Sequence, residues 1–233
     1  MYWYWDWYYY VTVIPALLFV LWAQLRVNST FRKYSNLHNN RNITGARAAQ
    51  YVLSQSGVSG VRIERVSGSL TDHYDPRENV IRLSETVYDS TSAAAVGVAC
   101  HEAGHAVQYA ENYAPIRFRA ALIPVTNFAC RLVLPLFIIS ILLAPALPFA
   151  WYLSDVCLAV FFLSTLLQIV TLPVEFNASR RAVRAIEDQG LLHGEELEGA
   201  KRVLSAAAMT YVAALALSLM QLFRFLLHRN RYR

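Results

Sequence analysis

Long apolar runs are the strongest pattern in this chain, and they predict four membrane-spanning helices. A helix needs about 20 mostly apolar residues to cross the hydrocarbon core of a bilayer. Four stretches are long enough, at residues 8–27, 132–149, 152–172 and 204–227. The two middle stretches are separated by a very short link, so they predict a helical hairpin. The last stretch ends in a basic tail, which leaves a helix lying in the membrane interface as the alternative to a fourth span.

The hydrophilic residues fall into two segments, 28–120 and 173–203, which flank the predicted hairpin. Because a hairpin crosses the membrane twice, both segments lie on the same side. Twelve lysines and arginines lie from Arg26 to Arg131, and five more from Arg180 to Arg202. Cytoplasmic segments carry an excess of such residues. We therefore expect both hydrophilic segments in the cytoplasm and the N-terminus outside.

The segment 28–120 has the pattern of a small α+β unit. Alanines, Val52 and Leu53 recur at helical spacing between a Thr44 cap and Gly57. Residues 61–66, 69–74 and 80–83 read as short strands of an antiparallel sheet, with a turn-rich insert at 75–79. Residues 89–92 offer N-caps for a second helix that runs to about Glu111.

Composition and charge support the membrane reading. Hydrophobic residues make up 56% of the 233 residues and charged residues only 16%, which excludes a disordered or acidic solvating chain. The net charge of +5 suits the cytoplasmic face of a membrane better than a nucleic-acid partner in so apolar a chain. Three cysteines without paired spacing argue against a disulfide framework.

One short motif carries chemistry, His101-Glu102-Ala103-Gly104-His105. Two histidines at i and i+4 lie one turn apart on the same helix face, so both imidazoles can reach one metal ion. Glu102 is the next residue around the helix and can accept a proton from an attacking water without being a ligand. Ala103 and Gly104 leave room for a facing element to come close.

A hydrolytic zinc site takes three protein ligands. The candidates for the third are Asp72, His73, Glu111, Glu175 and His193. Glu175 is the best of these, because it follows the third span directly and lies on the same side of the membrane as the histidines. We expect Pro173 to stand in the first turn of a new helix that carries Glu175.

These motifs together resemble the YugP-like family of neutral zinc metallopeptidases. The resemblance rests on the HEAGH motif, on residues 70–77 and 82–84 upstream and downstream of the predicted turn, and on residues 172–182. It covers nearly the whole chain beyond the first span. It implies a mainly α bacterial multi-pass membrane protein with a small α+β gluzincin-like metalloprotease domain on one side. His101, His105 and Glu175 would hold Zn²⁺, with Glu102 as the catalytic base.

The predicted spans and the motifs together divide the chain into five expected segments. Residues 1–27 form an aromatic-rich anchor, 28–120 the zinc protease domain, 121–172 the hairpin, 173–203 the third-ligand helix and a loop, and 204–233 the last helix and basic tail. In the similar site of HtpX-type proteases, an Asp follows the ligand Glu by four residues. Here that position is Ser179, so no carboxylate can orient a ligand histidine from it.

The implied function is hydrolysis of protein or peptide substrates at the membrane. The strand that holds Asp72, His73 and Tyr74 is a candidate edge for pairing with an extended substrate. The alternative candidates for stabilising the oxyanion are Arg180, Arg181, His73 and Tyr74. A homo-oligomer and a membrane regulator are left open as partners.

Three other readings compete with this one. The HEAGH helix could lie inside the bilayer, as in site-2 proteases, but it is rich in Ala and Gly and no later span carries an Asp-Gly ligand motif. The protein could be a catalytically silent metal-binding scaffold, against which the intact Glu102 speaks. A transporter is a weaker reading, because the spans lack a run of polar residues.

Overall fold

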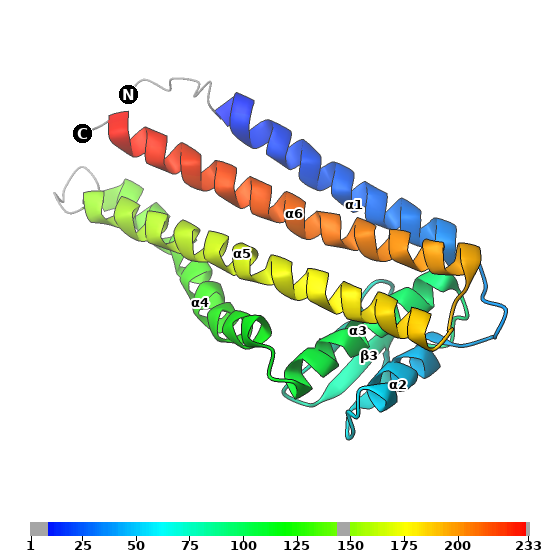
Figure 1. Ribbon diagram of the computed structural model, residues 1–233. Coiled ribbons are helices and arrows are strands. Elements are labelled where there is room, and N and C mark those ends of the chain that lie inside the picture. Colours follow the sequence, from blue (N-terminus) through cyan, green and yellow to red (C-terminus); the bar gives the residue numbers. More distant parts are fainter. Residues whose placement is uncertain (1–8, 144–149, 232–233) are drawn as a thin grey trace. The chain divides into compact units, whose positions relative to one another are not determined.

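The computed structural model describes residues 9–143 and 150–231. Its helices are α1 (Ile14–Ser35), α2 (Gly45–Gln55), α3 (Ala93–Ala110), α4 (Ala114–Leu143), α5 (Ala150–Asp188) and α6 (Gly194–Arg231), and a π-helical turn, Tyr9–Val13, precedes α1. The strands are β1 (Arg62–Val66), β2 (His73–Asp75) and β3 (Val80–Ser84) (Figure 1). The chain forms two compact units. One comprises Met1–Trp22, Arg117–Leu172 and Tyr211–Arg233, and the other Ala23–Ile116 and Pro173–Thr210.

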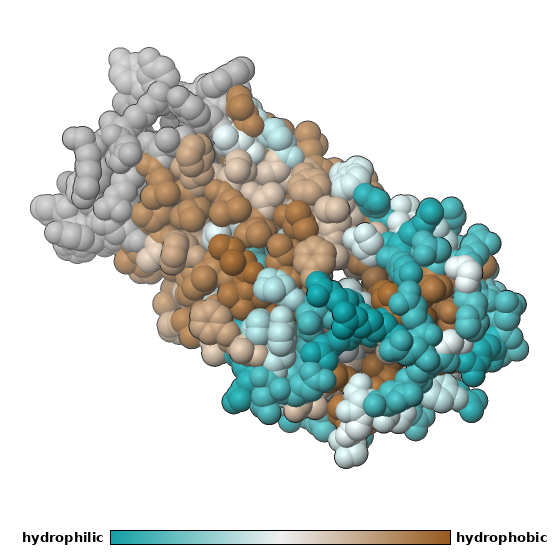
Figure 2. All heavy atoms as spheres, in the orientation of Figure 1, coloured by the Kyte–Doolittle hydropathy of each residue, from teal (hydrophilic) through white to brown (hydrophobic). Residues whose placement is uncertain are grey.

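The first unit is built from long apolar helices. Among the described residues, three helical stretches are long and apolar enough to cross a membrane, Tyr10–Ser35, Leu158–Asp188 and Gly194–Phe223. Large side chains such as Leu18 and Phe162 are exposed on them, as expected of surfaces that face lipid, and Figure 2 shows brown, apolar surface on this unit. The hydroxyls of Thr165 and Ser218 lie 2.7 Å apart and link α5 to α6 by the kind of polar contact that joins helices in membranes.

Among the described residues, three of the four predicted spans coincide with helices that are candidate spans by length and composition. The second predicted span, at 132–149, continues into residues 144–149, which lie outside the described part of the chain. Its first part belongs to α4, which contains Pro124 and Pro135. The aromatic residues before Tyr9 also lie outside the described residues.

The second unit holds a three-stranded sheet in the order β1-β3-β2. The prediction of an antiparallel sheet is wrong for one of its two pairings. β2 is antiparallel to β3, but β1 runs parallel to β3, with Arg62 opposite Val80 and Val66 opposite Ser84. Val80, Ile81 and Leu83 are fully buried, so β3 takes the centre and β1 and β2 become the edges. The chain reverses between β1 and β2 and again between β2 and β3, so β1 and β3 run in the same direction. The connection between β1 and β2 turns at Gly68 and Leu70, which both have positive φ.

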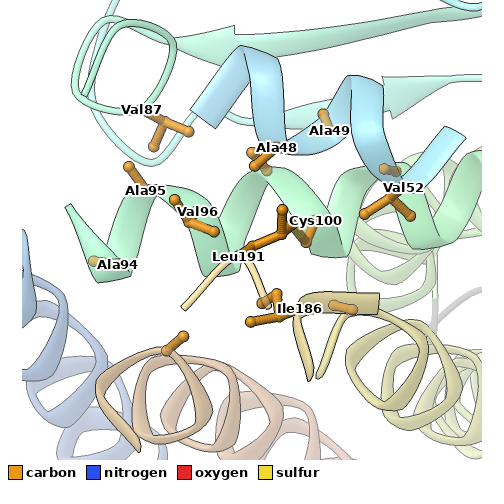
Figure 3. Close-up of a cluster of buried hydrophobic side chains, with 14 of the residues drawn as sticks. Ala48, Ala49, Val52, Val87, Ala94, Ala95, Val96, Cys100, Ile186 and Leu191 are labelled. Atoms are coloured by element: carbon orange, nitrogen blue, oxygen red, sulfur yellow. The ribbon is translucent and has the colours of Figure 1, made fainter. Parts of the chain in front are cut away.

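Helix α3 lies at the centre of this unit's core. Its N-cap is Ser92, whose hydroxyl accepts a hydrogen bond from the Ala95 N–H, and Thr44 caps α2 in the same way. Figure 3 shows Ala48, Ala49 and Val52 of α2 facing α3, with Ile186 and Leu191 completing the cluster of buried side chains. Small residues such as Ala95 and Ala99 allow helices to approach α3 from several sides.

Helix α5 corrects the expected start of the third-ligand helix. We expected one helix to end at residue 172 and another to begin at Pro173, but α5 is continuous from Ala150 to Asp188. The fixed φ of Pro173 is compatible with an α-helix. Because proline has no backbone N–H, the helix loses one hydrogen bond at this position, and membrane helices tolerate that loss. The apolar stretch and the segment that carries Glu175 therefore belong to one helix and not to two. α6 is likewise continuous from Gly194, ten residues before the predicted last span.

Candidate metal centre

Two helices bring three metal-binding side chains together. His101 and His105 lie on α3, and Glu175 lies on α5. The Glu175 Oε2 atom lies 3.2 Å from Nε2 of His101 and 3.5 Å from Nε2 of His105. One ligand atom from each residue lies within 4.8 Å of the other two. Glu175 is 2% exposed, so its carboxylate is held inside the protein.

Close contact between α3 and α5 makes this convergence possible. A Cβ atom built on Gly104 would lie 2.9 Å from the backbone oxygen of Ala178, closer than real Cβ atoms come to such an atom. The two helix backbones therefore come very close here, next to the ligand residue His105 and three residues from Glu175. This confirms the expectation that the small residues of the motif admit a facing element.

Each histidine is also held at its second ring nitrogen. Nδ1 of His101 lies 3.1 Å from the hydroxyl of Ser179, and Nδ1 of His105 lies 2.9 Å from Oε1 of Gln108. Both Nε2 atoms are thereby directed at Glu175. The sequence excluded a carboxylate at position 179, and the structure has a neutral hydroxyl there. Gln108 was missed by sequence reasoning, although a glutamine three residues after a ligand histidine on an apolar helix is a signal.

The donor set fits a divalent cation. Two imidazole Nε2 atoms and a carboxylate oxygen are ligands that zinc prefers. Burial disfavours charge on His105, but its hydrogen bond to Glu175 and the negative charges of Glu102 and Glu175 outweigh that effect and raise the pKa of His105. The side chains thus attract positive charge to the point where they converge.

Glu102 lies next to the cluster without belonging to it. It is 9% exposed, and it is not among the three residues whose ligand atoms converge. Its negative charge acts on His105 and on Asp72, so all three lie in one electrostatic neighbourhood. This position suits a group that exchanges protons beside a metal ion.

The residues expected to bind substrate have mixed surroundings. Asp72 accepts hydrogen bonds from the backbone N–H and the hydroxyl of Ser84, at 2.7 and 3.0 Å, and burial raises the pKa of its carboxyl. Tyr74 donates its hydroxyl to Asn79 at 2.8 Å, and its ring packs 5.6 Å from that of Tyr109 on α3. His73 is exposed and its Nδ1 lies 2.8 Å from the backbone oxygen of Thr71.

The remaining candidates, for the oxyanion and for the third ligand, differ in their contacts and exposure. Nε of Arg181 donates to Asn177 at 2.7 Å, and its Nη2 pairs with Glu111 at 2.7 Å. The same arginine lowers the pKa of Glu111. Arg180 and His193 are exposed. Neither His193 nor Glu111 is part of the cluster formed by His101, His105 and Glu175.

Comparison with known proteins gives a consistent result. Residues 9–230 match a family described as "Putative neutral zinc metallopeptidase". The chain is 43% identical over 214 residues to "Putative membrane protease YugP" of Bacillus subtilis (strain 168), an alignment that covers 92% of this chain and 93% of that protein. No solved structure matches the chain.

Proposed function

The chain belongs to the family described as "Putative neutral zinc metallopeptidase", and on that premise we propose that it is a membrane-anchored zinc endopeptidase. Its substrates would be membrane proteins or proteins close to the membrane. The observation that carries the proposal is the convergence of His101, His105 and Glu175 beside a buried Glu102 that stays outside the ligand set.

His101 and His105 would hold the zinc ion through Nε2, and Glu175 would hold it through its carboxylate. When bound, zinc supplies a Lewis acid that lowers the pKa of a water molecule towards about 7 and polarises the scissile carbonyl. The ligands need no rearrangement to do this, because their donor atoms already lie within 4.8 Å of one another. Ser179 and Gln108 hold the two rings in place from behind.

Glu102 would serve as general base and then as general acid. Its carboxylate takes the proton from the attacking water and later delivers it to the leaving amine nitrogen. Both proton transfers need a carboxylate that lies beside the zinc ion without coordinating it. Its low exposure strengthens this role, because electrostatic interactions are less screened away from bulk water.

Strand β2 is the proposed substrate edge. It pairs with β3 alone among the described strands, and an extended peptide would add to the edge that no described strand occupies. Tyr74 links this strand to α3 through Tyr109. Among the oxyanion candidates, Arg180 and His73 are exposed, whereas the side chains of Arg181 and Tyr74 already bond to other residues.

We further propose that the catalytic side faces the cytoplasm in a multi-pass arrangement. The basis is the distribution of charge: seventeen of the 21 lysines and arginines lie from Arg26 to Arg131 and from Arg180 to Arg202. A cysteine-accessibility measurement on intact cells tests it, with Arg65→Cys as the single cysteine in a chain whose three native cysteines are replaced by serine. Labelling of Arg65→Cys by a membrane-impermeant reagent in intact cells would contradict a cytoplasmic placement.

The test of the function is a paired measurement on detergent-purified wild type and Glu102→Gln. Zinc per chain is measured for both, together with cleavage of an unstructured test protein. We expect about one zinc per chain in both and cleavage by the wild type alone, since Glu102 acts on protons and not on the metal. Zinc binding without cleavage by the wild type would support a silent metal-binding scaffold instead. Absence of zinc from both would overturn the site.

A further inference from the structure

Gln108 is a buried polar side chain that the proposed mechanism does not use. It is 0% exposed and lies on α3 in the turn after His105. A buried amide is costly unless its donors and its acceptor are satisfied. Gln108 satisfies both ends: Oε1 faces Nδ1 of His105, and Nε2 faces two oxygen atoms of α5, at Val174 and Asn177.

The contacts with α5 fix which end of the amide is which. Nε2 of Gln108 lies 2.9 Å from the backbone oxygen of Val174, and a carbonyl can only accept a hydrogen bond. It also lies 2.9 Å from Oδ1 of Asn177. That atom is an oxygen because Nε of Arg181 points at it from 2.7 Å, and a guanidinium can only donate. Two independent partners therefore require the NH₂ group of Gln108 on this side.

The other end of the amide is then the carbonyl oxygen, and it fixes the tautomer of His105. This oxygen lies 2.9 Å from Nδ1, so Nδ1 must carry the proton. In a neutral ring Nε2 then has the free lone pair that a metal ligand needs. His101 lacks this constraint, because the hydroxyl of Ser179 can either donate or accept.

We propose that Gln108 is a positioning residue of the zinc site, which holds His105 in the Nδ1-protonated tautomer with Nε2 directed at the metal. Asn177 and Arg181 act behind it by fixing the orientation of the Gln108 amide. The proposal rests on the proposed function, because it takes the cluster to be a zinc site. Arg181 then serves to orient Asn177 and Gln108 and not to stabilise the oxyanion.

Two substitutions at position 108 separate this role from a merely structural one. Both Gln108→Met and Gln108→Glu remove the hydrogen bonds donated to Val174 and Asn177. Only Gln108→Glu keeps an oxygen that accepts from Nδ1. If Gln108 were only a clamp between α3 and α5, both variants would lose zinc affinity, and Gln108→Glu would lose more because its carboxylate faces two oxygens.

The experiment measures zinc affinity by competition with a chelating dye, on full-length protein in detergent. We expect Gln108→Met to weaken zinc binding by about 10- to 100-fold, the usual loss for partners behind a ligand. Gln108→Glu is expected to recover most of that affinity. Asn177→Asp keeps the oxygen that accepts from both Arg181 and Gln108, and it is expected to stay close to wild-type affinity. Gln55→Met and Gln55→Glu, at an exposed site on α2, are the matched controls.

A second measurement needs no variant at position 108. In zinc-loaded protein labelled with ¹⁵N-histidine, the His105 signals are expected to show a proton on Nδ1 and the metal on Nε2, with His105→Asn identifying them. The reverse pattern overturns the proposal, as does equal zinc affinity of wild type and Gln108→Met. Failure of the wild type to bind zinc also overturns it. If the wild type binds zinc and cleaves nothing, the proposed function fails while the affinities still decide the role of Gln108.

Discussion

The hydroxyl of Ser179 on α5 lies 3.1 Å from Nδ1 of His101 on α3, on the side of the ring opposite Glu175. One helix therefore holds this histidine at both nitrogens. The ligand carboxylate faces Nε2 and the hydroxyl faces Nδ1. Partners of this kind usually orient a ligand and raise its basicity.

Substitutions at Ser179 are expected to change zinc affinity in opposite directions. Ser179→Ala removes the Nδ1 partner and should weaken zinc binding, but by less than Gln108→Met, because a hydroxyl does not fix the tautomer. Ser179→Asp places a carboxylate at the same position and should strengthen binding. Zinc affinities of the two variants and the wild type check both expectations. Weaker binding by Ser179→Asp than by Ser179→Ala would contradict them.

Removal of zinc is expected to destabilise the wild type. A ligand present at 100 times its dissociation constant stabilises the folded state by about 2.7 kcal/mol. A strong chelator should therefore lower the unfolding temperature of the wild type, and Glu175→Ala should show no such response. Glu187→Ala, on the same helix but paired with Lys201 at the surface, is the control and should respond like the wild type. Full retention of zinc by Glu175→Ala would show that Glu175 is not a ligand.

Asp72 is expected to make stability fall as pH rises. Burial raises the pKa of its carboxyl above 3.8, so the folded state holds this proton more tightly than the unfolded state. The favourable contribution is complete below pH 3.8 and is lost as the pH rises through the folded-state pKa. Asp72→Asn keeps an acceptor for the Ser84 N–H and does not titrate. Wild type should therefore lose stability relative to this variant across that range, measured by thermal unfolding at a series of pH values. A constant difference would contradict the expectation.

Gly104→Ala is expected to damage the site through packing. The added methyl group would meet the Ala178 backbone oxygen at 2.9 Å, so α3 and α5 must separate. Overpacking of this kind costs about 1–3 kcal/mol, and it should also weaken zinc binding because the ligands come from both helices. Gly97→Ala on the same helix is the comparison, since its methyl group meets the Ala200 side chain at 3.2 Å. Unfolding temperature and zinc affinity are measured for both, and equal effects would argue against the helix-separation account.

The sequence predicted most of what depends on local periodicity. The i, i+4 spacing placed His101 and His105 on one face of a helix, and serine and threonine caps marked the starts of α2 and α3. Glu175 was predicted as the third ligand from topology, because the predicted hairpin returns the chain to the side of the membrane where the histidines lie. The structure brings it to the histidines, as that reasoning expected, and its role as a zinc ligand stays a prediction.

What the sequence did not predict depends on contacts between distant residues. The parallel pairing of β1 with β3 follows from a strand order in which the buried β3 lies between β1 and β2, and no local signal gives that order. Pro173 carries the same local signal at a helix start and inside a long helix, so the continuity of α5 was not visible. The orientation of Gln108 is set by Val174 and Asn177, which lie more than sixty residues away in the chain.

The contact at Gly104 also limits which second-site mutations can restore a damaged protein. The obstructing atom is a main-chain oxygen, so replacing the Ala178 side chain cannot remove it. A genetic selection for suppressors of Gly104→Ala should therefore return the original glycine, or substitutions elsewhere that shift a whole helix. Position 104 thus has no simple compensating partner, in contrast to core sites where one side chain shrinks as another grows.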